Sequence, residues 1–464
     1  MMRPASQSGA ALLTVLTVLA VLGVVVGLLL DRTRSDIRPW ASEIEKTQAT
    51  YLAESGIAYQ LYLERFSDSA EPSFSAGKPK ADTDGLAPAK APTDTFNFRL
   101  DTALKIPEVN VDRNRAFLEI TSIGRYRNTE VTVMARYGKA LDDSIFGPAL
   151  TLENSMPLEP FPRDKIKGSV RIKSAAPGTP NLPWPAPFSV TGYAATLSDA
   201  KYNSMEAVLQ KKLAEEGGMS GNGTFDPKHP PLFPKSHDLF FPLGQVELSN
   251  DADETWIIRG PCRIFSEGEM RIRGRIRLEN VQLFSGKDIT FEDSVTGSEN
   301  TVFARGSIFI HDRCNLGMDA LAGKDIILQN RSQTTLASVL ISVGNRHAAN
   351  AAQGGDTLNA IRVVNEAVAR GFLIAGGPNG RVALATAANL VEGVIIASSV
   401  WLDGEVHGPV LAQKLLCEGT NARNCLGAGK IDRSKLPLDF VQPLQLGNQD
   451  RRRFVFRLME WRRS

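Results

Sequence analysis

The chain has 464 residues, which is more than the length of one typical domain. Its hydrophobic content of 42% allows a packed core, and its net charge of +2 argues against nucleic acid as a partner. Aromatic residues make up only 7% of the chain, and 39 glycines and 26 prolines favour a mainly β protein with many turns.

Residues 10–30 form an apolar run without a charged side chain. A helix of this length spans roughly 30 Å, the thickness of a bilayer core, so the run predicts a transmembrane helix. It is longer than the apolar core of about 7–15 residues in a secretory signal, and no small-x-small cleavage site follows it. A cleaved signal peptide and a plain membrane anchor remain alternatives. Gly23 and Gly27 form a G-x-x-x-G pair, which either lets another helix approach closely or consists of ordinary membrane-helix glycines.

Residues 31–66 continue as a predicted amphipathic helix, with apolar residues at steps of three, four or seven. Pro39 predicts a kink or a break near the membrane surface. Residues 67–95 are rich in Ser, Ala, Pro, Lys and Asp, a composition typical of a flexible linker.

Two further stretches extend this N-terminal pattern. YLAESGI begins at Tyr51 on the amphipathic helix. FLEITSIGRYRNTEVTVMARYG, Phe117 to Gly138, predicts two strands joined in a hairpin at Arg127, within a small β region over 96–140. Together with the short segment that ends at Gly9, these stretches resemble the large minor pilins and pseudopilins of type IV pili and type II secretion. The resemblance covers about residues 1–140.

The resemblance implies a leader of residues 1–9, cut by prepilin peptidase between Gly9 and Ala10. It also implies other pilin-like subunits as partners of the N-terminal helix. The protein would cross the cytoplasmic membrane once, with its large domain in the periplasm or at the cell surface. The fifth mature residue would be Thr14, where most pilins carry Glu. Since the tip pseudopilin of type II secretion also lacks this Glu, the departure points to a tip or minor subunit.

Residues 141–250 give no functional pattern. The sequence predicts an irregular middle section with one helix, Ser198 to Glu216, and an early β-helix rung at Ile166 and Ile172. At the other end of the chain, residues 441–464 form a basic tail. Its alternating apolar residues predict either a final strand with a solvated basic face or a contact with an anionic surface.

Residues 251–440 carry a repeat of about 19 residues. Apolar residues recur at steps of 6, 6 and 7, and i, i+2 apolar pairs indicate strands. The pattern predicts a parallel β-helix, in which similar side chains stack inward from turn to turn. The spacing resembles bactofilin-like and hexapeptide β-helices. A long insertion, 344–370, would hold one helix from Leu358 to Ala369. The predicted inward positions are Ile264, Met270, Ile276, Leu283, Ile289, Val295, Val302, Ile308, Cys314, Leu321, Ile327, Gln333 and Leu340, followed after the insertion by Leu384, Leu390, Ile396 and Leu402.

Catalytic and metal-binding patterns are weak. The five histidines, His229, His237, His311, His347 and His407, lack metal-ligand spacing, and no cofactor motif is present. Asp288 and Asp325 occupy equivalent places in two near-copy repeats, where they either cap turns or line up to bind a cation or sugar. Cys314 falls on an inward position. Cys417 and Cys425 could form a disulfide in an oxidising compartment.

Two functions follow from this sequence. The first is a non-enzymatic, pilin-like envelope subunit that displays a β-helix. The second is a membrane-tethered β-helix enzyme or binding protein that acts on polysaccharide, which would require acidic side chains to converge in a groove along the solenoid.

Overall fold

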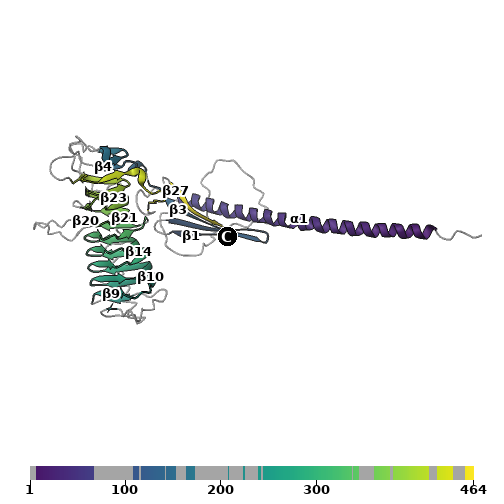
Figure 1. Ribbon diagram of the computed structural model, residues 1–464, viewed down its shortest axis with the longest axis horizontal. Coiled ribbons are helices and arrows are strands. Elements are labelled where there is room, and N and C mark those ends of the chain that lie inside the picture. Colours follow the sequence, from purple (N-terminus) through teal and green to yellow (C-terminus); the bar gives the residue numbers. More distant parts are fainter. Residues whose placement is uncertain are drawn as a thin grey trace, which may run out of the picture. The chain divides into compact units, whose positions relative to one another are not determined.

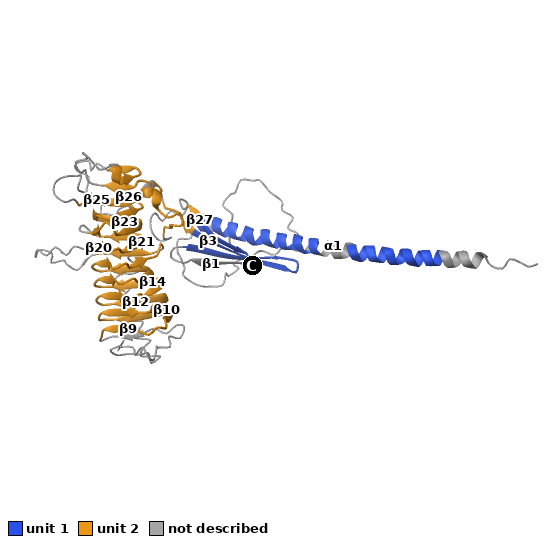
Figure 2. Ribbon diagram, in the orientation of Figure 1, with its two compact units in different colours: residues 1–137, 458–464 blue, residues 138–457 orange. Residues whose placement is uncertain are grey.

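The computed structural model divides into two compact units, residues 1–137 with 458–464 and residues 138–457 (Figures 1 and 2). The structure describes residues 7–66, 108–113, 117–141, 143–152, 163–172, 207, 223–224, 239–241, 244–336, 338–343, 360–376, 380–416, 426–442 and 455–463. The linker predicted over 67–95 lies outside these residues, as does all of the predicted helix Ser198–Glu216 except residue 207.

The first unit joins a 60-residue helix, α1 (Gln7–Phe66), to a four-stranded sheet. The helix includes Pro39 and continues past it. The sheet has the order β1 (Glu108–Arg113), β2 (Phe117–Tyr126), β3 (Thr129–Lys139) and β27 (Phe456–Arg463). β1 and β2 are antiparallel, and β2 turns into β3 at Arg127, whose φ is +51°. The predicted hairpin is therefore present.

The C-terminal strand β27 completes this sheet beside β3. The β-helix is thus inserted in the chain between two neighbouring strands of the small sheet. The residues predicted as a basic tail end in a sheet strand whose Arg457, Arg462 and Arg463 are exposed.

The second unit is a parallel β-helix, as the 19-residue repeat predicts (Figure 1). Residues in neighbouring turns pair in parallel register, such as Ile289 with Ile308. A short helix, α2 (Asp143–Phe146), precedes it. The 23 strands are β4 (Leu150–Leu152), β5 (Ile166–Lys167), β6 (Val170–Ile172), β7 (Gly223–Thr224), β8 (Leu239–Phe241), β9 (Val246–Asn250), β10 (Trp256–Ser266), β11 (Met270–Gly274), β12 (Ile276–Ser285), β13 (Ile289–Glu292), β14 (Thr296–Ala304), β15 (Ile308–Ile310), β16 (Asn315–Ala322), β17 (Ile326–Leu328), β18 (Gln333–Thr334), β19 (Val339–Ser342), β20 (Ala360–Val363), β21 (Val368–Ala375), β22 (Arg381–Leu384), β23 (Leu390–Leu402), β24 (Glu405–His407), β25 (Val410–Leu415) and β26 (Lys430–Asp432).

The predicted register is correct through Cys314 and then slips by one residue. Ile308 pairs with Ile326, and Val302 pairs with Ala320, so this turn has 18 residues. The predicted inward residues Leu321 and Ile327 are therefore wrong. Because side chains alternate along a strand, a one-residue change in turn length moves each of them to the other face.

The same slip affects the later run. Val391 and Ile395 lie in the inner core, where Leu390 and Ile396 were predicted. Leu390 is half-buried, and Ile396 belongs to an apolar cluster outside the solenoid. Since neighbouring turns here differ in length, a fixed period cannot keep the register.

The predicted helix Leu358–Ala369 is wrong, because the chain forms β20 and the start of β21 there. The two strands are separated by a corner at Asn365 and Glu366, with φ values of +52° and +64°. Two successive left-handed residues are incompatible with an α-helix. Residues 344–359 lie outside the described residues, and the solenoid has resumed by Ala360.

The predicted early rung is present but stacks at the end of the solenoid that the chain reaches last. Ile166 of β5 pairs with Ile431 of β26, and Leu150 of β4 pairs with Val410 of β25. Figure 1 shows β4 at one end of the ladder and β9 at the other. The segment that enters the solenoid first therefore covers its final turns.

An outer apolar cluster covers one side of the solenoid, in addition to the inner core. Phe372 contacts Phe146 of α2 and Phe440, with ring centroids 6.2 and 5.4 Å apart. The sequence carries a signal for this layer, namely adjacent apolar pairs such as Ile264–Phe265. In each pair one side chain points inward and the next points outward.

Candidate functional site

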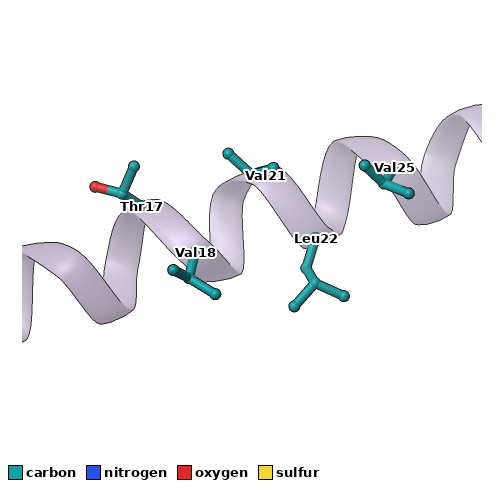
Figure 3. A pocket seen from close by; sticks show the side chains of 5 residues that line it. All are labelled: Thr17, Val18, Val21, Leu22 and Val25. Carbon is teal, nitrogen blue, oxygen red and sulfur yellow. The ribbon is translucent and has the colours of Figure 1, made fainter.

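The N-terminal half of α1 presents an apolar surface that no other described segment covers. The 18 residues Val15–Arg32 have a mean hydropathy of 2.2, and none is buried. Figure 3 shows Thr17, Val18, Val21, Leu22 and Val25 projecting from neighbouring turns of this helix. By length and composition, the segment can cross a membrane.

Both glycines of the G-x-x-x-G pair lie within this exposed segment. A β-carbon built at Gly23 or Gly27 would meet no other described atom within 4 Å. The two positions are four residues apart and therefore share one face of the helix. This leaves a flat patch that a second helix could approach closely.

The predicted processing positions Gly9 and Ala10 lie in the first turn of α1, and their side chains are outside the described part of the structure. Cys417 and Cys425 also lie outside the described residues, so the proposed disulfide stays a prediction.

The C-terminal half of α1 packs on the small sheet. Ala49, Ala53 and Ile57 are at most 1% exposed. Gly124 of β2 faces this stretch, and a β-carbon there would lie 2.6 Å from the Ala53 nitrogen. The absence of a side chain at this point therefore lets helix and strand approach closely.

Polar contacts also hold this half of the helix to the β2–β3 hairpin. Glu45 accepts hydrogen bonds from Arg127 Nη1 at 3.2 Å and from Thr129 Oγ1 at 3.4 Å. One continuous helix therefore has a packed C-terminal half and an exposed apolar N-terminal half.

The amphipathic part of α1 has a second, exposed apolar face. Trp40, Ile44, Tyr51 and Tyr62 are 57–69% exposed. At 3.6 residues per turn they project away from the side that carries Ala53. The YLAESGI stretch thus contributes to both faces, through Tyr51 outward and Ala53 inward.

The acidic residues singled out in the repeats cap turns. Asp288 Oδ1 accepts a hydrogen bond from the Ser307 backbone at 2.6 Å, and Asp325 Oδ1 accepts one from the Ala360 backbone at 2.8 Å. Asp325 also pairs with Arg362 at 3.6 Å. Each carboxylate therefore ties one turn of the solenoid to the next.

The described residues contain no group of three or more His, Cys, Asp or Glu side chains that could hold a metal ion. His311 contacts Gln329 and stacks on Phe309, and burial lowers its pKa. His407 hydrogen-bonds Glu405 at 3.1 Å. The other three histidines, His229, His237 and His347, lie outside the described residues.

Cys314 is fully buried in the inner core, as its inward position predicts. Burial raises the pKa of its thiol to about 12, so the group is protonated and unreactive at neutral pH.

No model of a known protein family matches the chain, and no curated protein matches its sequence. Among solved structures, the crystal structure of the competence-associated pilin ComZ from Thermus thermophilus is similar over 90% of this chain and 97% of that chain. The sequence identity is 10% and the TM-score is 0.18, which is too low to carry an argument about function.

Proposed function

We propose that the chain is a non-catalytic, pilin-like subunit of a type IV pilus or a type II secretion system. The N-terminal half of α1 inserts into the cytoplasmic membrane, and the β-helix is displayed outside it. The observation that supports this proposal is the division of α1 into a half that packs on the small sheet and a half whose apolar side chains are exposed.

The free energy of exposed apolar surface gives the physical reason. Twelve Val and Leu side chains between Val15 and Leu30 are 46–66% exposed. Burying such a side chain fully is worth about 1.5–3 kcal/mol, so the segment gains well over 10 kcal/mol in a lipid or helical environment. A helix of this kind leaves the bilayer readily only into a bundle of like helices, with Gly23 and Gly27 at the closest approach.

Prepilin peptidase is the proposed processing enzyme. Cleavage between Gly9 and Ala10 would place a new amino terminus directly before the apolar run, leaving the exposed face of α1 intact. Other pilin-like subunits are the proposed partners of this face.

A position at the filament tip fits the size of the second unit. Residues 138–457 form a solenoid that is much larger than the small sheet on α1. A shaft subunit must pack neighbours on all sides, whereas nothing sits above a tip subunit. Thr14 agrees with this position, since a tip subunit has no earlier amino terminus to neutralise.

N-terminal sequencing of the protein from native membranes tests the proposal. We expect the mature chain to begin at Ala10 and to remain in the membrane fraction. A chain that begins at Met1 would leave an ordinary membrane anchor, and one that begins beyond Leu30 would indicate a secretory signal. Either result would contradict the pilin-like assignment.

A further inference from the structure

One corner of the β-helix is built in the same way in four successive turns. The chain turns at two consecutive residues with positive φ, as at Asp312 and Arg313 (+52° and +65°) and at Asn330 and Arg331 (+56° and +63°). The same corner recurs at 293–294 and 365–366. Backbone hydrogen bonds link the corners, for example from Arg313 N to Asn330 O at 3.1 Å, so the corners stack in register.

The first residue of each corner is Asp or Asn, and these side chains form a ladder. Asn365 Nδ2 donates to Asn330 Oδ1 at 3.2 Å, and Asn330 Nδ2 donates to Asp312 Oδ1 at 2.9 Å. Asp and Asn tolerate left-handed backbone better than other residues with a side chain, so the backbone alone explains their presence.

The second residue of each corner has no such explanation. Arg313, Arg331 and Glu366 carry long charged side chains at left-handed positions, which is uncommon. Arg331 Nε pairs with Glu366 at 2.6 Å. The exposed Arg313 side chain has no hydrogen bond or ion pair to another described residue. A free guanidinium with five donors is therefore held beside a row of carboxylate and amide groups.

These two columns line a groove of about 700 Å³, within the range of small-molecule sites. Three carboxylates and two guanidinium groups occur along it, so a polyanion would meet Asp312 and a polycation would meet Arg313. A hydroxyl group is both a donor and an acceptor and can satisfy either neighbour. The lining therefore suits a neutral, hydroxyl-rich ligand.

The repetition along the solenoid indicates that the ligand is linear. Strands of neighbouring turns lie about 4.8 Å apart, so the four corners extend over roughly 14 Å. A stacked aromatic pair adjoins the groove, because His311 directly precedes Asp312 and packs on Phe309 with centroids 5.8 Å apart. Sugar rings combine hydroxyl edges with apolar faces that can pack on such rings.

We infer that this corner groove binds a neutral linear glycan that runs along the solenoid axis. Arg313 donates to the sugar oxygens, and the Asp312–Asn330–Asn365 ladder exchanges hydrogen bonds with the hydroxyls. This binding site goes beyond the proposed assembly role and does not depend on α1.

Titration calorimetry of the full chain in lauryldimethylamine oxide, a detergent without sugar, tests the inference. The probes are cellohexaose, maltohexaose and chitohexaose, with polygalacturonate as an anionic comparison. We expect at least one neutral probe to bind and Arg313→Ala to weaken its binding tenfold or more. Lys324→Ala, which removes a positive charge outside the groove, is the matched control and should bind like the wild type.

Circular dichroism should show the same strand content and thermal midpoint for both variants, since neither side chain holds the fold together. The inference is overturned if none of the three neutral probes binds, if only polygalacturonate binds, or if Arg313→Ala binds as well as Lys324→Ala.

Discussion

Gly124 of β2 faces Ala49 of α1 so closely that a β-carbon at position 124 would overlap the Ala49 carbonyl oxygen. The obstacle is helix backbone, which cannot rotate aside as a flexible side chain could. This contact, together with the Glu45–Arg127 ion pair at 3.2 Å, holds the C-terminal half of the helix to the sheet.

Replacing Gly124 with Ala should loosen this half of α1. The added methyl group must push helix and strand apart, at a cost of about 1–3 kcal/mol. Hydrogen exchange of the amides around Ala53 should become faster. Gly23→Ala is the matched control, because its β-carbon meets nothing within 4 Å, and it should leave this exchange unchanged. Equal exchange in both variants would show that the contact does not position the helix.

Ile289→Asp should unfold the β-helix, whereas Thr290→Asp should be much milder. Ile289 is completely buried between turns, so its replacement would place an unpaired charge in the inner core at a cost of several kcal/mol. Thr290, the next residue, projects outward and is half-buried. Denaturant unfolding followed by circular dichroism measures the difference. Similar losses of stability in both variants would mean that the two faces of β13 are assigned the wrong way round.

The inward face of the solenoid could be predicted because it obeys a local rule. Residues such as Ile289 and Ile308 must be apolar for every turn to close over its neighbour, and this requirement leaves a period in the sequence. The period fails where turn length changes, as it does after Ile308, because nothing in a single turn reports the length of the next.

The pairings between distant parts of the chain could not be predicted. β27 joins β3 from the C-terminus, and β4 covers β25 from the far side of the sequence. A strand three residues long, such as β4, has no periodicity that would identify its partner. The corner groove was also missed, because the signal was sought in the apolar positions and the groove is built from polar pairs.

Cys314 should resist alkylation in the folded protein. Its thiol is buried and its pKa is raised to about 12, so almost no thiolate is available at pH 8. Treatment with iodoacetamide followed by peptide mass spectrometry should find Cys314 unmodified in buffer and modified in denaturant. Rapid modification under native conditions would show that this turn of the solenoid opens readily.

Glu405→Gln should lower the stability of the β-helix at pH 7 but hardly at pH 3. The hydrogen bond from His407, helped by Lys435, lowers the pKa of Glu405 below its ordinary value of 4.5. A lowered folded-state pKa stabilises the protein above pH 4.5, and this contribution is lost as the pH falls through the folded-state value. Since the carboxylate is 39% exposed, the effect is a few tenths of a kcal/mol. Denaturant midpoints at both pH values measure it, and a difference that does not shrink at pH 3 would contradict the assignment.

Gold labels on the β-helix should mark one end of a filament. A shaft built from this chain would have to house residues 138–457 at every subunit, whereas one tip subunit meets no neighbour above it. A tag at the exposed Lys324 provides the attachment point, and electron microscopy of sheared filaments provides the count. We expect few labels per filament, all at one end. Regular labelling along the shaft would contradict the tip position but leave the membrane-inserted helix intact, and labels on no filament would favour a tethered β-helix protein that acts on glycans alone.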